Sequence, residues 1–214
     1  MVTDALFLVI PILICLTFHE LAHAFVAHLL GDRTAKNQGR LTLNPLKHID
    51  PIGFIALLIF RFGWAKPVMV DMTNFKRPKL YMAITALAGP VSNIILAVIM
   101  FFIFGLVITP LNELITNRET RLIIFNMILN TGRISIVLAV FNMIPIPPLD
   151  GSKVLFSLLP ERIYYGIMHV ERYGFILLII FINLDIFNRT VGALISTLVD
   201  RFMPIAEMAF NLVN

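Results

Sequence analysis

The sequence predicts an all-α polytopic membrane protein, a bundle of about four to six transmembrane helices with a small membrane-associated β-strand or re-entrant region after the first helix. Of the 214 residues, 58% are hydrophobic and 14% are charged, whereas soluble domains contain about 45–50% apolar and about 25% charged residues. The mean hydropathy is +0.88. The apolar residues form several long blocks, which indicates repeated crossings of a bilayer rather than one anchor.

Four apolar blocks are the candidate membrane segments: Ala5–Leu30, Ala83–Thr109, Leu122–Pro147 and about Tyr173–Phe187. The first block lacks the positive n-region of a cleaved signal peptide, so we expect it to be retained as a helix. "AGPVSN" interrupts the second block, and "NTGR" in the third favours a short helix or turn before a span that begins at Ile134. The fourth is short for a crossing, and the residues after it form either a further tilted span or an interfacial helix.

Residues 31–80 have a different pattern. The stretches "GRLTLNP" and "KPVMV" alternate as strands do, contain β-branched residues, and are bounded by Gly, Asn and Pro. The stretch "GFIALLIF" between them is too short to cross a bilayer as a helix. We therefore expect strands or a re-entrant hairpin. Because exposed strand edges cannot face lipid, this region should pack against the helices or line a wet cavity.

The basic residues indicate an orientation. Residues 31–80 hold nine of the 17 Lys and Arg residues, the loop after the second block holds only Arg118 and Arg121, and residues 1–18 hold none. The positive-inside rule then places the N-terminus outside and residues 31–80 in the cytoplasm. The net charge of +4 is therefore explained by loops that face anionic lipid, and no nucleic-acid partner is expected.

The first block contains "HELAH" at membrane depth. His19 and His23 are four residues apart, so on a helix they share one face and can bind one metal ion. Glu20 lies at the flank of that site, where it could take a proton from a water activated by zinc. Titratable residues are costly inside a bilayer and are functional candidates by default. The alternative is that these side chains only hydrogen-bond to neighbouring helices and hold the bundle together.

A catalytic zinc site usually has three protein ligands and one open position, so a third ligand is needed. The single cysteine, Cys15, lies among aliphatic residues and is better explained as a small hydrophobic residue. Asp150 in "FNMIPIPPLDGSKV" is a stronger candidate, because three prolines before it fix the backbone and Gly151 permits a tight turn. The alternative is an ordinary helix-ending turn with a solvated aspartate.

Together, "HELAH" and "NMIPIPPLDG" resemble the paired motifs of the site-2 protease family of intramembrane zinc metalloproteases. "GRLTLNPLKHIDPIG", "GWAKPV" and "AGPVSN" also resemble its short prokaryotic members, so the resemblance covers about residues 15–155. It implies that His19, His23 and Asp150 bind one Zn²⁺ per chain and that Glu20 is the general base. It also implies hydrolysis of a peptide bond in or beside a transmembrane segment, in a prokaryotic cell membrane.

We expect residues 1–214 to form a single integral membrane protease domain, with a catalytic core at about 5–155 and C-terminal helices at about 160–214. Some family members carry a PDZ or CBS domain, for which this chain has no room. The expected partners are the lipid bilayer and transmembrane protein substrates. A substrate helix would unwind locally, and the expected strands of residues 31–80 could capture it by edge addition.

Two asparagines are further candidates for the site. Asn93 in "AGPVSN" could donate a hydrogen bond to the developing oxyanion or hold the substrate backbone, or it could bond between closely packed helices. Asn142 could orient a ligand, act on the substrate as Asn93 would, or cap a broken helix end. His28 is expected at the interface and His48 in a structural role.

Two other classes of function remain open. A metal transporter could also carry intramembrane histidines and carboxylates, but it would more often show internal symmetry, which this sequence does not show. A non-catalytic relative could keep the fold as a binding module, but it would be expected to lose Glu20 or one of the ligands. All of those residues are present.

Overall fold

The computed structural model describes residues 2–60, 63–168 and 173–213, and nearly all of the regular structure in them is helical. The helices are α1 (Val2–Leu29), α2 (Thr34–Asn37), α3 (Pro51–Phe60), α4 (Pro78–Leu114), α5 (Arg118–Asn142), α6 (Asp150–Ser157), α7 (Glu161–Met168), α8 (Gly174–Ile182) and α9 (Asp185–Asn211), with 3₁₀ turns η1 (Pro45–Lys47) and η2 (Met72–Asn74). An all-helical fold is confirmed.

Three of the described helices are long and apolar enough to cross a membrane: α1 from Leu8 to Leu29, α4 and α5. The chain is therefore an integral membrane protein, with fewer candidate spans among the described residues than the four to six expected. Helix α8 has only nine residues, which is about 14 Å of helix against a hydrocarbon core of about 30 Å. Helix α9 is long enough, but charged residues recur along it.

The expected strands between residues 31 and 80 are wrong. The described part of this region holds α2, η1, α3 and η2, and its only β-type pairing is an isolated antiparallel bridge between Ile49 and Ala65. The stretch "GFIALLIF" lies within α3. Pro67 has no N–H group to extend the bridge into a ladder. Two N–H groups further along bond to side chains instead of to a neighbouring strand: that of Val68 to Glu20 and that of Asp71 to Asp32.

Helices α4 and α5 run without a break through "AGPVSN" and "NTGR", so the expected turn in the third block is also wrong. Thr131 and Gly132 of "NTGR" are buried in the helix bundle, whereas Arg133 is exposed. The Thr131 hydroxyl donates to the Met127 carbonyl one turn earlier. Gly132 lets Phe101 of α4 approach closely, since a Cβ there would lie 3.1 Å from the Phe101 ring. Helical hydrogen bonding and close packing therefore outweigh the local turn signals.

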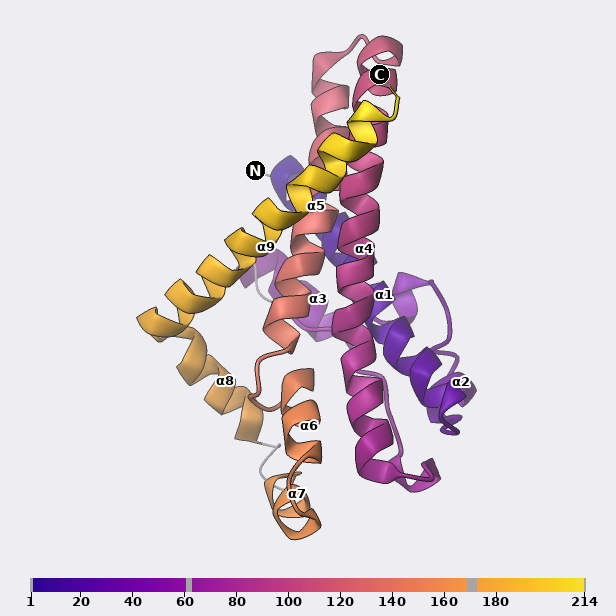
Figure 1. Cartoon of the computed structure of the whole chain (residues 1–214), viewed down its shortest axis with the longest axis vertical. Helices are drawn as coiled ribbons and strands as arrows, with labels where there is room; N and C mark the ends of the chain where they lie inside the picture. The colour runs from indigo at the N-terminus through magenta and orange to yellow at the C-terminus, as the bar shows by residue number, and fades with distance from the viewer. Residues whose placement is uncertain (1, 61–62, 169–172, 214) are drawn as a thin grey trace.

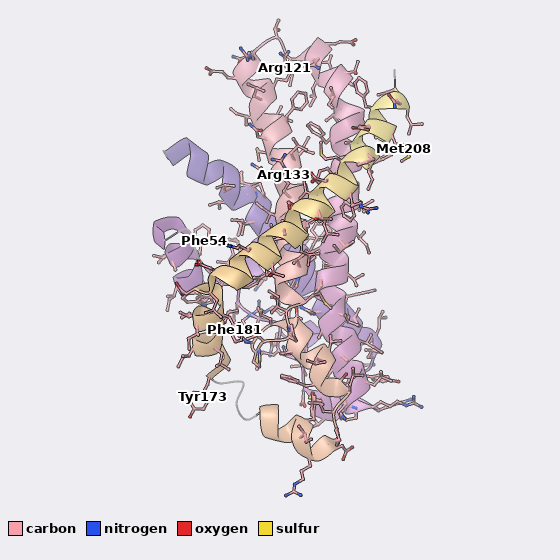
Figure 2. The ribbon with its side chains drawn as sticks, turned by 60° about the vertical axis from the view of Figure 1, so that its left-hand side comes forward. Phe54, Arg121, Arg133, Tyr173, Phe181 and Met208 are labelled. Carbon is pink, nitrogen blue, oxygen red and sulfur yellow. The ribbon has the colours of Figure 1, made fainter. Side chains whose placement is uncertain are left out.

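The long helices α4 and α5 lie antiparallel and side by side, and α9 crosses them diagonally (Figure 1). A buried cluster formed by Ala97, Phe101, Ile136 and Val140 joins α4 to α5, and apolar side chains of α9 pack against it. The view in Figure 2 places Arg121 beside the α4–α5 connection and Tyr173 toward the opposite end. Helix α1 packs against both long helices, and α6 follows the end of α5, so α1, α4 and α6 can meet.

Candidate metal centre

Helix α1 places the two histidines of "HELAH" one above the other. His19 and His23 are 5% and 7% exposed, and their Nε2 atoms are 3.0 Å apart. The four-residue spacing produces this arrangement because residues i and i+4 lie on the same face of a helix. Two imidazole nitrogens therefore point at one spot inside the membrane-spanning part of the protein.

The turn after α5 brings Asp150 to the same spot. Asp150 is the first residue of α6 and is 8% exposed. Its Oδ2 atom lies 3.0 Å from Nε2 of His19 and 3.2 Å from Nε2 of His23, although 131 positions separate Asp150 from His19. A Cβ at Gly151 would overlap the carbonyl group of Met143, so glycine is required for the turn to fold back this closely.

These three side chains fit a zinc ion. His19, His23 and Asp150 each offer one ligand atom, and the three atoms lie within 4.8 Å of one another. Ligands at about 2.0–2.1 Å from a tetrahedral zinc ion are separated by roughly 3.3 Å, close to the 3.0–3.2 Å found here. Two imidazoles and one carboxylate are also a donor set that zinc enzymes use, with one position left open.

Helix α4 supports both histidines from behind through Thr85, Gly89 and Asn93, which are spaced four residues apart. The Thr85 carbonyl oxygen lies 2.7 Å from Nδ1 of His23, and Nδ2 of Asn93 lies 3.2 Å from Nδ1 of His19. A Cβ at Gly89 would lie 2.5 Å from Cε1 of His19 and 2.5 Å from Nε2 of His23. Gly89 therefore lets α4 approach the two rings. Because the Thr85 carbonyl can only accept a hydrogen bond, Nδ1 of His23 carries the proton and Nε2 of His23 is free to bind a metal.

Glu20 is held on the other side of the site. Its Oε2 atom accepts a hydrogen bond of 2.9 Å from the backbone N–H of Val68, which lies in the segment after the Ile49–Ala65 bridge. Glu20 is 9% exposed and lines a cavity of about 460 Å³ together with His19, His23 and Asp150. A water or a peptide in this cavity can therefore reach the carboxylate and the three metal-binding side chains at once.

Asp32, just beyond the end of α1, anchors the chain that follows Val68. It is fully buried and accepts hydrogen bonds from the backbone N–H of Asp71, the amide of Asn74 and both the N–H and the hydroxyl of Thr34. Burial raises the pKa of Asp32, but these hydrogen bonds outweigh it and hold the pKa below its usual value. The ionised carboxylate therefore fixes the chain three residues beyond Val68.

The remaining candidates are placed as follows. Asn142 lines the cavity, and its Nδ2 donates to the Leu138 carbonyl one turn earlier in α5. Asn93 is fully buried behind His19. Among the described residues, His28 and His48 are not part of the metal-binding group; Nε2 of the buried His48 bonds to the Thr42 carbonyl.

Cys15 is also outside the metal-binding group, and its Sγ lies 3.1 Å from the hydroxyl oxygen of Ser135. Reasoning from the sequence missed the contributions of Thr85, Gly89 and Val68. Thr85 and Gly89 could have been found from their four-residue spacing to Asn93, whereas nothing in the sequence marks Val68.

Comparisons with known proteins agree with this geometry. Residues 7–184 match the sequence model of peptidase family M50. The chain belongs to this family. It is 45% identical over 174 residues to "Putative zinc metalloprotease YwhC" of Bacillus subtilis, covering 81% of this chain and 78% of that protein. It is 28% identical to "Putative zinc metalloprotease Rip2" of Mycolicibacterium smegmatis, covering 83% of this chain and 66% of the relative.

It is also 37% identical over 139 residues to "Putative zinc metalloprotease MJ0611" of Methanocaldococcus jannaschii, or 64% of this chain and 63% of that protein. No solved structure matches the chain. The family membership and the cluster of His19, His23 and Asp150 together establish that this M50 member is a zinc metalloprotease with Zn²⁺ as its cofactor.

Proposed function

We propose that this M50 member is an intramembrane endopeptidase, which hydrolyses a peptide bond in or next to a transmembrane segment of a membrane protein. The observation that carries the proposal is the position of the site. The two histidines lie in one candidate membrane span, their supports lie in a second, and Asp150 begins the helix that follows a third. A protease site built between spanning helices is positioned to act on peptide within or beside the membrane.

In this proposal His19, His23 and Asp150 hold the zinc ion and Glu20 is the general base. When bound, zinc polarises the carbonyl group of the scissile bond and lowers the pKa of a water molecule. Glu20 takes one proton from the attacking water as the new C–O bond forms. It then delivers that proton to the leaving nitrogen as the C–N bond breaks, which yields a carboxylate end and an amine end.

The contact between Glu20 and Val68 fits this role. One carboxylate oxygen, Oε2, is occupied by the Val68 N–H, which leaves the other oxygen for the proton transfer. A backbone N–H on a chain anchored through Asp32 restrains the rotation of Glu20 without adding another charge to the site. The carboxylate therefore stays aligned with the cavity before a substrate arrives, and little reorganisation is needed.

The cavity also indicates how the substrate is held. Its wall includes residues 67–70 together with Asn142 and Lys153. A transmembrane helix bonds its amides internally, so the substrate must unwind locally before its peptide bond can enter. Asn142 remains a candidate for contact with the unwound substrate, because it lines the cavity.

The distribution of charge supports an orientation with the N-terminus outside and the site toward the cytoplasm. Nine of the 17 basic residues lie between residues 31 and 80, the region that follows the site end of α1 and carries Val68. The positive-inside rule favours the cytoplasmic side for such a segment. We propose this topology, in a prokaryotic cell membrane, as the setting for the reaction.

The test compares the protein with Glu20→Gln after reconstitution into vesicles, with Glu113→Gln as the matched control, because Glu113 is exposed near the far end of α4. The probes are tagged single-span proteins whose transmembrane segment contains a helix-breaking Asn–Pro pair, and the same peptide placed in a soluble loop. We expect Glu20→Gln to keep its zinc and lose cleavage, and Glu113→Gln to retain both.

Three results would contradict the proposal. Unchanged cleavage by Glu20→Gln would remove Glu20 as the base. Equal cleavage of the soluble loop and the transmembrane segment would show a protease that is not specialised for the membrane. If zinc is bound but no transmembrane probe is cut, the alternatives of a metal transporter or a binding module would be favoured instead.

A further inference from the structure

Asn93 occupies an unusual place beside the metal-binding group. Its side chain is fully buried, and Nδ2 lies 3.2 Å from Nδ1 of His19, the ring nitrogen that faces away from Asp150 and His23. The other amide atom, Oδ1, is buried without a hydrogen-bond partner in the described structure. A buried carbonyl oxygen without a hydrogen-bond partner costs free energy, so this orientation of the Asn93 amide is unfavourable.

The protonation of His19 decides which end of the amide should face it. In a neutral imidazole one nitrogen carries the proton and the other is free. Nε2 of His19 is the atom that converges with Nε2 of His23 and Oδ2 of Asp150. If Nε2 binds a metal, Nδ1 must carry the proton and needs an acceptor. Asn93 can supply one only by presenting Oδ1 in place of Nδ2.

We propose that Asn93 is a positioning residue for His19, whose amide oxygen accepts the Nδ1 proton when zinc is bound. Rotating the amide by about half a turn exchanges two groups of nearly equal shape, and it gives the unpartnered Oδ1 a donor. The hydrogen bond then holds the ring with Nε2 toward the metal. The Thr85 carbonyl already does the same for His23, so helix α4 orients both imidazoles.

This role differs from contact with the substrate. Asn93 does not line the cavity that contains Glu20 and the metal-binding side chains, because the His19 ring lies between them. An oxyanion donor must reach the reacting carbonyl, and a side chain that is fully buried behind a ligand does not. Partners of metal-bound histidines typically change metal affinity by about 10–100-fold when they are removed.

The experiment measures zinc affinity by competition with a chelator in Asn93→Leu and Asn93→Asp, with Ser92→Ala as the matched control. Ser92 is the next residue along α4, and its hydroxyl bonds to the Gly89 carbonyl. Leucine keeps the size but offers no acceptor, so we expect its zinc affinity to fall by about 10–100-fold. Aspartate can only accept, so we expect wild-type affinity or tighter, with cleavage retained. Ser92→Ala should match the wild type.

The visible spectrum of the cobalt-substituted protein gives a second readout, which should shift in Asn93→Leu and stay unchanged in Asn93→Asp. Wild-type zinc affinity in a folded Asn93→Leu would overturn the proposal. So would a loss of cleavage in Asn93→Asp at full zinc occupancy, because that result marks Asn93 as a donor to the reaction. The Asp variant decides the matter if the Leu variant does not fold.

The inference rests on the proposed binding of zinc by His19. It does not depend on which peptide is cleaved, because zinc affinity and the cobalt spectrum are measured without a substrate. A protein that binds zinc with the expected dependence on residue 93 but cuts no membrane probe would contradict the proposed function and leave the role of Asn93 intact.

Discussion

Replacing Gly89 by alanine is the sharpest test of how the site is packed. The added Cβ would lie 2.5 Å from Cε1 of His19, 2.6 Å from Nε2 of His19 and 2.5 Å from Nε2 of His23. Carbon atoms normally stay about 3.5 Å apart, so the two rings or α4 itself would have to shift by roughly 1 Å. Metal–ligand distances tolerate only about 0.2 Å. The methyl group would also enter the space where the ligand nitrogens converge.

We therefore expect zinc affinity to fall by at least about 100-fold in Gly89→Ala, the upper end of the range for groups that merely orient a ligand. The assay is the zinc content after dialysis against chelators of graded affinity, with circular dichroism to show that the helices remain. Gly192→Ala on α9 is the matched control, because no atom lies within 4 Å of a Cβ added there. It should keep its zinc and gain about 0.5–1 kcal/mol of stability from the better helix former.

A folded Gly89→Ala variant that binds zinc as tightly as the wild type would refute the reasoning. It would mean that α4 does not press against the two imidazoles, and that their placement does not depend on the close approach of these helices. The roles inferred for Thr85 and Asn93 would then also lose their structural basis, since both act from the same face of α4.

Three further predictions follow from single contacts. Val68→Pro removes the N–H that holds Glu20, and we expect the rate of cleavage to fall by about 10–100-fold with zinc retained. The control is Met69→Pro, and equal cleavage rates in the two variants would count against a role for the Val68 N–H. The depressed pKa of Asp32 stabilises the fold above about pH 4. This stability should be lost as the pH falls through the folded pKa, seen as faster amide exchange at residues 71–74, and Asp32→Asn should show no such pH step. Gly105→Ala would push a methyl group into a backbone carbonyl of α9. We expect the free energy of unfolding, measured by thermal unfolding, to fall by about 1–3 kcal/mol. An unchanged stability would show that α4 and α9 are not closely packed at this point.

Several features were determined by short-range properties of the sequence. The spacing of His19 and His23 depends only on helical periodicity, and the apolar blocks depend only on local composition. Asp150 could be singled out because prolines and a glycine surround it, which is also a local signal. These features survive folding because neighbouring residues in a helix keep their geometry wherever the helix is packed.

Other features depended on partners distant in the sequence, and only the tertiary structure decided them. The segment around Val68 has the alternation of a strand, yet the N–H groups of Val68 and Asp71 bond to two carboxylates distant in the sequence, Glu20 within α1 and Asp32 just beyond it. The "NTGR" turn signal was overridden by packing between α5 and α4. Local preference is worth less than a buried hydrogen bond or a close helix contact when the two compete.

The metal centre shows the same division. "HELAH" by itself specifies two aligned imidazoles and a carboxylate beside them. The packing of α1, α4 and α6 decides whether Asp150 completes the group, over a separation of 131 residues from His19. It also decides whether Thr85, Gly89 and Asn93 orient the rings. Helical periodicity determines where a side chain points on its own helix, but convergence on one point needs the fixed positions of three helices.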